Sequence, residues 1–454
     1  MGITIDFSRM LPAFPREAVA SYGARVRALH ARLAERRAAG GLPFYDLPTQ
    51  DTSGLKACAR RLEGRFANLV VLGIGGSALG LIALNSALRT PYRWAEKAPR
   101  LYVLDNIDPE RVRTLLDALD PRETLVNVIT KSGDTAETMA SFLIFREWLR
   151  AGAGEAGYRE RMLVTTDRAK GALRRIADQD RLLNFAVPDG VGGRFSVLTP
   201  VGLLPAALIG IDVDGLLAGA AAMAARTGSP ELLENPAYLG AVLHYLGWLG
   251  GRRISVMLAY SDRLYDLADW YRQLWAESLG KRADLEGAEV RVGPTPVRSL
   301  GVTDQHSQLQ LYKEGPDDKI YTLLGVQRFP VEAPIPRAFP ELEAVAYLGG
   351  RGLGELFQAE ARATEAALVK EGRPLTSVIF PAVDAVAVGE FFFWLEVQTV
   401  AAGDLLGINP MDQPGVEEGK QFAYGLLGRP GYESRRAAVE AIRSAAGAGG
   451  LSFS

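Results

Sequence analysis

The stretch Val70-Val-Leu-Gly-Ile-Gly-Gly-Ser-Ala-Leu-Gly80 is an apolar, strand-like run that breaks into glycines and one serine. Further along, Thr130-Lys-Ser-Gly-Asp-Thr-Ala-Glu-Thr138 places four hydroxyl side chains and a lysine where a helix should begin. Glycine loops and helix N-termini bind anions through backbone N–H groups and the helix dipole. The pair predicts an α/β fold in which two loops hold a phosphorylated small molecule.

Short β-rich runs alternate with helical segments around these loops, which predicts parallel, doubly wound sheets between helical layers. In the first half the expected strands are Asn68–Leu72, Arg100–Leu104, Leu125–Thr130 and Met162–Thr166. After a turn near Gly228, the strands Arg253–Tyr260, Lys319–Val326 and Ser377–Pro381 indicate a second unit of the same class.

Helical segments flank these units, among them Arg16–Ala39 and the apolar run Glu390–Ala402. We therefore expect an N-terminal helical segment over 1–45 and a C-terminal helical extension over 406–454. Between them, a first α/β domain over 46–222 carries the two loops, and a second α/β domain covers 223–405.

Composition argues against several classes of partner. The 454 residues carry a formal net charge of −2, so no electrostatic argument favours nucleic acid or an anionic membrane. The most apolar stretch, Val197–Val213, contains Pro200 and Pro205 and is too short and broken to span a bilayer. The single cysteine, Cys58, and the lack of a secretion-signal pattern predict a reducing, cytoplasmic location.

The glycine loop also fits a dinucleotide pattern, because Gly73-Ile-Gly75-Gly76-Ser77-Ala78 matches G-x-G-x-x-G/A. An NAD site needs an acidic residue about 20 positions on, and the nearest candidate, Asp105, comes late. Ser77 adds a hydroxyl that a pyrophosphate turn does not need. A phosphate-binding loop is therefore favoured, while an NAD oxidoreductase and a turn without ligand stay open as alternatives.

The second loop predicts a monophosphate site at a helix N-terminus. Asp134 and Glu137 have capping-box spacing, so a helix is expected to begin here and to run to Arg150. Capping explains one hydroxyl, not four. The four hydroxyls are those of Thr130, Ser132, Thr135 and Thr138.

Candidates for chemistry follow in the second half. Gln273 and Glu277 are four residues apart on a predicted helix and share a face, and the apolar neighbours of Glu277 suit a partly desolvated general base. His306 lies in a polar segment and is a candidate for acid–base work near neutral pH. Arg194 follows a glycine turn and can grip an oxyanion or a carboxylate.

Near the C-terminus, Gln413 and Lys420 are seven residues apart, which predicts two helical turns with both side chains on one face. The three histidines, His30, His244 and His306, are scattered and show no metal-ligand spacing. An isomerase that uses a metal-assisted hydride shift needs such a cluster. The sequence therefore favours proton transfer through an enediol, without metal or cofactor.

Taken together, these motifs resemble the phosphoglucose isomerase family (glucose-6-phosphate isomerases), in order from about Gly73 to Lys420. Asp189–Gly202 and Asp412–Lys420 are similar to its two signature stretches, and the length resembles the compact bacterial type. The resemblance implies reversible isomerisation of D-glucose 6-phosphate and D-fructose 6-phosphate through a cis-enediol, in glycolysis and gluconeogenesis. It also implies two sugar-isomerase (SIS) type domains, each a five-stranded parallel sheet in a three-layer arrangement.

The resemblance further implies a role for each candidate residue. Glu277 would be the base, Arg194 would stabilise the developing negative charge, and Lys420 and His306 would open the sugar ring. Gln273 and Gln413 would hold the substrate. The 6-phosphate would be held by Gly76, Ser77, Thr130, Lys131, Ser132, Thr135 and Thr138.

In this family the histidine comes from the neighbouring subunit, so the resemblance implies a homodimer with shared sites. Met411 and Leu279 depart from the family pattern at what should be packing positions. A non-catalytic sugar-phosphate sensor is the other alternative, although it would have no need for Glu277, His306 and Lys420 together.

Overall fold

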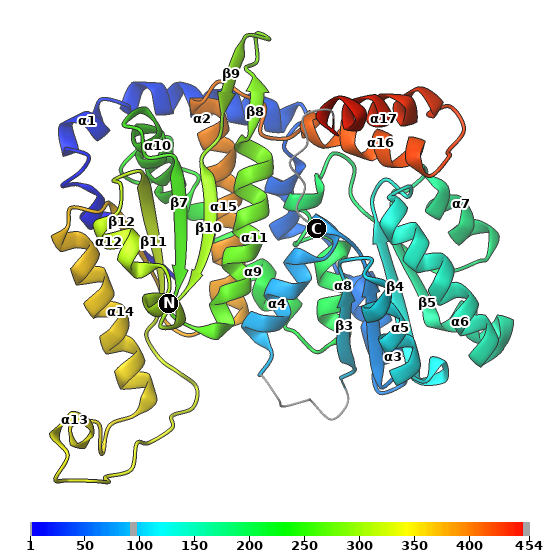
Figure 1. The fold of residues 1–454 in the computed structure, drawn as a ribbon, viewed down its shortest axis with the longest axis horizontal. Coiled ribbons are helices and arrows are strands. Elements are labelled where there is room, and N and C mark those ends of the chain that lie inside the picture. Colours follow the sequence, from blue (N-terminus) through cyan, green and yellow to red (C-terminus); the bar gives the residue numbers. More distant parts are fainter. Residues whose placement is uncertain (1, 91–97, 448–454) are drawn as a thin grey trace.

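The computed structural model describes residues 2–90 and 98–447. Its two α/β units stand side by side in Figure 1, and each holds a five-stranded sheet between helices. A two-stranded hairpin, a long arm and two C-terminal helices extend from this body.

The first sheet is parallel throughout and has the order β3-β2-β4-β5-β6. The structure confirms the four predicted strands and adds β6, an edge strand whose residues are only partly buried. Val70 and Leu72 face one side of the sheet, and Leu69 and Val71 face the other, so both faces need a helical cover. The strands are β2 (Asn68–Leu72), β3 (Arg100–Leu104), β4 (Thr124–Thr130), β5 (Met162–Thr166) and β6 (Leu183–Ala186).

Three helices cover each face of this sheet. One face packs on α5 (Pro109–Ala118), α6 (Ala136–Arg161) and α7 (Ala172–Gln179), and the other on α3 (Ser53–Leu62), α4 (Leu79–Leu88) and α8 (Pro200–Leu208). Helix α6 extends past its predicted end at Arg150. Gly154 has a left-handed φ of 74° and kinks the helix just beyond that point.

The second sheet has the order β1-β12-β11-β7-β10. Four of its strands are parallel, namely β7 (Ile254–Ala259), β10 (Thr295–Leu300), β11 (Lys319–Val326) and β12 (Leu375–Phe380). The fifth, β1 (Thr4–Asp6), pairs antiparallel with β12. The expectation of an all-parallel second sheet and of a purely helical N-terminal segment is therefore wrong, because a three-residue strand is too short to show alternation in the sequence.

The predicted helix Arg16–Ala39 is also two helices, α1 (Arg16–Ala20) and α2 (Gly23–Ala38). The break falls just before Gly23, a poor helix former. Around the second sheet, α12 (Leu309–Glu314) and α14 (Leu353–Lys370) cover one face. The other face packs on α10 (Pro236–Leu249), α11 (Asp262–Leu279) and α15 (Ala385–Leu405).

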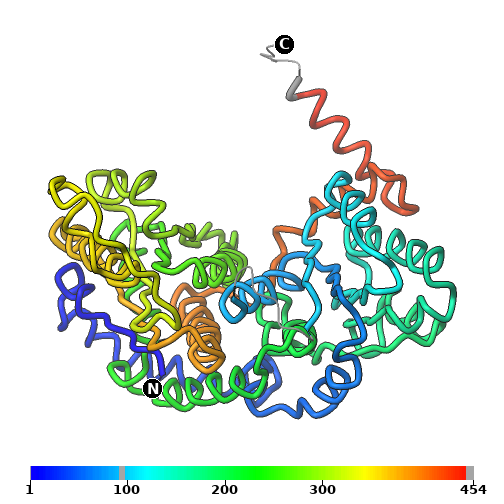
Figure 2. Tube along the Cα trace, turned by 90° about the horizontal axis from the view of Figure 1, so that it is seen from below, coloured from blue at the N-terminus to red at the C-terminus, as the bar shows by residue number. Residues whose placement is uncertain are grey.

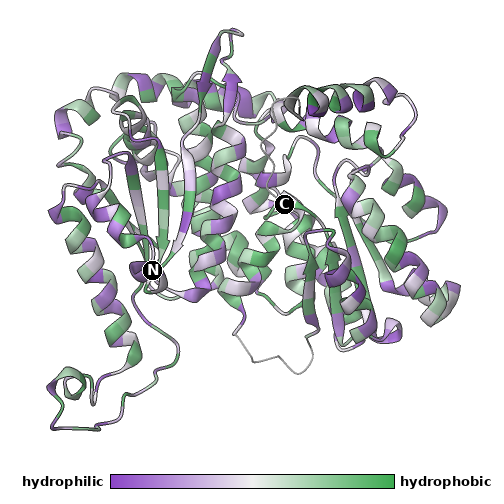
Figure 3. Ribbon diagram, in the orientation of Figure 1, coloured by the Kyte–Doolittle hydropathy of each residue, from purple (hydrophilic) through white to green (hydrophobic). Residues whose placement is uncertain are grey.

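Helix α15 joins the two halves. It packs on α10, α11 and α9 (Val213–Arg226), and one hydrophobic core includes residues from both sheets. The strands of the two five-stranded sheets are largely hydrophobic in Figure 3, whereas the β8–β9 hairpin is largely hydrophilic and the outer helices carry residues of both kinds. Among the described residues, α15 is the one helix that is long and apolar enough to cross a membrane. However, 94% of its apolar window is buried inside the protein. Helix α15 is a core helix. The stretch Val197–Val213, which is the most apolar in the sequence, does not meet the same criterion.

Three segments project from the body. Strands β8 (Lys281–Ala283) and β9 (Glu289–Val292) form a hairpin directly after α11. The arm between β11 and α14 carries α13 (Glu343–Ala346), at the lower left of Figure 1. Helices α16 (Glu417–Leu426) and α17 (Glu433–Gly447) pack together, and Figure 2 shows α17 reaching away from both units.

Candidate active site

The segment between β6 and α8 contacts the glycine loop, Lys131, Glu277 and Gln413. Its 3-10 turn η5 (Gly193–Phe195) packs against η3 (Gly75–Ser77), the turn that follows β2. A Cβ at Gly76 would lie 2.2 Å from the Gly193 carbonyl carbon, so the two backbones meet where only glycine fits. Lys131 Nζ donates to the carbonyl of Val191, 2.7 Å away, which brings the hydroxyl loop to the same segment.

The hydroxyl loop forms a cluster at the start of α6. Thr130 Oγ1 lies 2.9 Å from Thr135 Oγ1, and Ser132 Oγ lies 3.4 Å and 3.3 Å from these two atoms. The Thr138 hydroxyl is buried and has no hydrogen-bond partner in the described part of the chain. These donors stand at the N-terminus of a long helix, which is a favourable environment for a phosphate dianion.

Two details of this loop differ from the prediction. The capping box does not form, because Thr135 is the N-cap residue, without a side-chain cap bond, and Asp134 accepts from the backbone N–H of Ala172 instead (3.1 Å). Lys131 points to Val191 rather than to the three hydroxyls. Its role in the structure is to join the loop to the segment that carries Arg194.

Glu277 and Gln273 share one face of α11, as predicted. Gln273 Nε2 donates to Glu277 Oε2 across 3.0 Å, and a Cβ at Gly75 would lie 3.0 Å from the same Nε2. The glycine loop and this helix are therefore in contact. Glu277 keeps 25% of its side chain exposed, and its carboxylate faces Arg194 rather than the apolar side chains beside it in the sequence, since these point into the core.

Arg194 is the centre of the network, with only 2% of its side chain exposed. Its Nη1 lies 3.4 Å from Glu277 Oε1 and donates to Gln413 Oε1 (3.0 Å). Its Nε donates to Ser278 Oγ (2.6 Å), and its Nη2 to the carbonyls of Pro410 (2.5 Å) and Asp412 (3.0 Å). Burial lowers the pKa of Arg194, and the charges of Glu277 and Asp412 oppose that shift. A guanidinium held by this many acceptors is a fixed positive charge beside a carboxylate.

Lys281 is a member of this group that sequence reasoning missed. Its Nζ donates to the backbone carbonyls of Glu277 (2.8 Å) and Ser278 (2.9 Å) and lies 3.7 Å from Asp412 Oδ1. Burial first, and then the charge of Arg194, lower its pKa to about 8. Its signal in the sequence is the stretch Glu277-Ser-Leu-Gly-Lys281, which places Lys281 four residues after Glu277.

Gln413 and Lys420 do not form one helical face. Gln413 precedes a 3-10 turn, η7 (Pro414–Val416), with a φ of −154°, and α16 begins only at Glu417. Gln413 reaches Arg194, whereas the exposed Lys420 donates to Glu417 Oε1 on its own helix (2.7 Å). Met411 packs against the core and Leu279 is fully buried, so both departures from the family pattern are packing positions.

His306 lies at the opposite end of α11 from Glu277. It is exposed in η6 (Thr303–His306), at the carboxyl end of β10, while α11 starts at that edge of the sheet and runs away from it. The fifteen helical steps from Asp262 to Glu277 span about 22 Å. One chain therefore does not bring His306 to Glu277.

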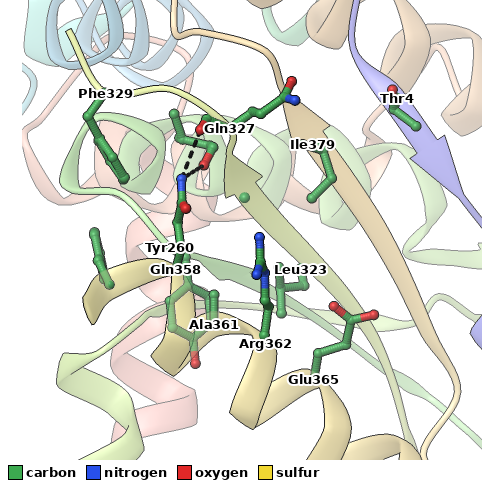
Figure 4. Close-up of a pocket in the computed structure, with 13 residues that line it drawn as sticks. Thr4, Tyr260, Leu323, Gln327, Phe329, Gln358, Ala361, Arg362, Glu365 and Ile379 are labelled. Carbon is green, nitrogen blue, oxygen red and sulfur yellow. Dashed lines mark hydrogen bonds between the residues drawn. The ribbon is translucent and has the colours of Figure 1, made fainter. Parts of the chain in front are cut away.

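A cavity of about 420 Å³ lies at this same edge and is lined by residues of β1, β11, β12 and α14 and by Tyr260 (Figure 4). Its described lining includes none of the predicted catalytic residues. Tyr260 accepts a hydrogen bond from Gln305 Nε2 (2.8 Å), so the cavity lies behind the turn that carries His306.

Elsewhere, the described residues contain no group of three or more His, Cys, Asp or Glu side chains that could hold a metal ion. Ring nitrogen Nδ1 of His30 lies 3.0 Å from the Tyr238 hydroxyl, and His244 is buried against Trp275. Asp105, the acidic residue that the NAD alternative needs, is paired with Arg111 (2.8 Å).

Comparison with known proteins gives a consistent answer. The model of the phosphoglucose isomerase family matches residues 59–441. A glucose-6-phosphate isomerase of Carboxydothermus hydrogenoformans is 45% identical over 98% of this chain and 98% of its own length. One of Rubrobacter xylanophilus is 48% identical over 84% of this chain and 87% of its own.

Solved structures agree on the fold. A hypothetical protein from Thermus thermophilus has a TM-score of 0.86 and 41% identity, covering 94% of this chain and 100% of that one. A glucose-6-phosphate isomerase from Chlamydia trachomatis has a TM-score of 0.82, covers 98% of this chain and 92% of that one, and is 22% identical.

Proposed function

Because the chain belongs to the phosphoglucose isomerase family and interconverts glucose 6-phosphate and fructose 6-phosphate, we propose that Glu277 is the base that moves the proton between C1 and C2. This reaction is a step of glycolysis and gluconeogenesis. The observation that carries the proposal is the network of Glu277, Arg194, Gln273 and Gln413.

In the proposed mechanism the open-chain aldose loses its C2 proton to the Glu277 carboxylate. The electron pair forms the C1–C2 double bond, and O1 takes up a proton, which gives a cis-enediol. The protonated Glu277 then returns its proton to C1 while O2 loses one, and the ketose results. The fixed charge of Arg194 stabilises the negative charge that develops on these oxygens. Gln273 and Gln413 hold the substrate beside the carboxylate.

The 6-phosphate is assigned to the hydroxyl cluster. Thr130, Ser132, Thr135 and Thr138 supply hydroxyls at the N-terminus of α6, and Gly76 and Ser77 border the same region through the 189–196 segment. Lys131 supports this site by holding the loop to Val191, and adds a positive charge near it.

Ring opening is assigned to Lys420 and to His306 of the partner subunit. The separation of about 22 Å along α11 supports a homodimer with shared sites, since a second copy can supply the histidine that one chain keeps away from Glu277. The arm between β11 and α14 supports the same proposal. It exposes 77% of Val331, 62% of Phe339 and 64% of Tyr347, a degree of apolar exposure typical of an interface. We place the enzyme in the cytoplasm, where its one buried cysteine, Cys58, stays reduced.

The test is turnover of fructose 6-phosphate, coupled to glucose-6-phosphate dehydrogenase in the presence of EDTA. Glu277→Gln should lower kcat by at least about 1000-fold while fructose 6-phosphate still binds. Glu286→Gln, an exposed site on the β8–β9 turn, is the matched control and should behave as wild type. A kcat near wild type in Glu277→Gln would refute the assignment of Glu277 as the base.

A further inference from the structure

Lys281 lies inside the catalytic network and has no role in the mechanism above. Only 6% of its side chain is exposed, although lysine is rarely buried to this extent. It stands in β8, just after the helix that carries Glu277, and its side chain turns back toward that helix. A buried ammonium in such a place needs a physical explanation.

The side-chain hydrogen bonds and the ion pair of Lys281 connect the end of α11 to the segment that contains Asp412. Its Nζ donates to the carbonyls of Glu277 and Ser278, which belong to the last turn of α11 and have no partner further along the helix. The same ammonium is 3.7 Å from Asp412, next to Gln413. It therefore joins the end of α11 to the segment that holds Arg194 from the other side.

We propose that Lys281 is a positioning residue that fixes the last turn of α11, and with it the Glu277 carboxylate, against the segment 409–413. The proposal rests on the proposed function of Glu277. Lys281 acts through the backbone of Glu277 and through Asp412, so its effect should fall on kcat more than on KM.

The charge of Lys281 makes this role dependent on pH. The charged groups that face it are Arg194 on η5, Glu277 on α11 and Asp412 in the segment 409–413. Burial and Arg194 lower its pKa to about 8, and Asp412 and Glu277 hold it from falling further. Above this pH the neutral amine loses its attraction to Asp412 and to the negative end of the helix dipole. As a result, Lys281 holds the last turn of α11, and with it Glu277, less firmly against Asp412.

The experiment is the pH profile of kcat for fructose 6-phosphate in the full-length enzyme. The wild type should lose kcat with a midpoint near pH 8. Lys281→Arg keeps its charge at every working pH, so this loss should disappear while kcat at pH 7 stays within about tenfold. Lys281→Met should lower kcat by about 10- to 100-fold with KM within about threefold. Asp412→Asn should move the midpoint to lower pH, because a negative neighbour favours the ammonium.

Lys319→Met is the matched control, since Lys319 is also buried, with 5% of its side chain exposed, but pairs with Asp318 at the start of β11. It should keep the wild-type profile. A wild-type midpoint in Lys281→Arg, or an unmoved one in Asp412→Asn, would overturn the proposal even if Lys281→Met fails to fold. Full turnover in Glu277→Gln would instead overturn the proposed function, so the two failures are distinguishable.

Discussion

Arg194→Lys is the substitution that best separates fixed charge from hydrogen-bond geometry in this site. The guanidinium makes four hydrogen bonds, to Ser278, Gln413, Pro410 and Asp412, besides its ion pair with Glu277. A lysine keeps the positive charge but offers a compact ammonium instead of a planar fork. Since an ammonium has three donors and no planar fork, we expect it to keep about two of these four hydrogen bonds.

The magnitude follows from the bonds that are lost. Losing two hydrogen bonds, each of which contributes about 1 kcal/mol, should lower the free energy of unfolding by about 2 kcal/mol. For catalysis, a displaced positive charge stabilises the enediolate less, and the loss of one such donor typically costs about 3 kcal/mol, or about 100-fold in kcat. KM should change less than kcat, because this charge acts mainly in the transition state.

The assay combines coupled turnover of fructose 6-phosphate with urea unfolding of the same preparation. Arg174→Lys is the matched control, since Arg174 is also buried and binds Asp178 and Asn184 in α7 and β6, away from the site. It should lose stability and keep kcat. If Arg194→Lys loses stability but keeps kcat within about threefold, Arg194 is a structural clamp and the electrostatic assignment is wrong.

Three further predictions test the loops and the core. Gly76→Ala should lower kcat and destabilise the fold by about 1–3 kcal/mol in urea unfolding, because the new Cβ would lie 2.2 Å from Gly193. The matched control is Gly54→Ala in α3, whose Cβ would meet nothing within 4 Å and which should be neutral or stabilising in the same measurement. Ser132→Ala should raise KM for fructose 6-phosphate several-fold with little change in kcat, and an unchanged KM would contradict its place at the phosphate. The Glu396 carboxyl in α15 is fully buried without a hydrogen-bond partner among the described residues, and burial raises its pKa well above the ordinary value. Because the folded pKa is raised, the contribution of this carboxyl to stability is present at acid pH and is lost as the pH rises from the unfolded pKa through the folded pKa. Glu396→Gln should therefore reduce the fall in the free energy of unfolding between pH 5 and pH 8, as measured by urea unfolding. An equal fall in the wild type and the variant would refute this prediction.

Much of the fold could be predicted because its signals are local. Strands that are buried on both faces appear in the sequence as continuous apolar runs such as Asn68–Leu72. The glycine loop and the hydroxyl loop predict helix starts from their residue types alone. The i, i+4 pairing of Gln273 and Glu277 was equally local and is present in the structure. Strands β1, β6 and β10 gave weaker patterns, because they are short, partly exposed or at a sheet edge.

The sequence by itself determined the α/β class, the positions of the glycine loop and the hydroxyl loop, and the kinds of side chain available for proton transfer, because helix and strand periods and turn chemistry act between near neighbours. Only the tertiary structure decided that Arg194 binds Glu277, 83 residues away, that Asp412 and Gln413 join the same network, and that His306 stands at the far end of α11. These relations depend on how the 189–196 segment, α11 and the 409–413 segment pack around a shared core. No periodicity along the chain encodes that packing, since the free energy that holds it comes from contacts between residues 83 to 219 positions apart.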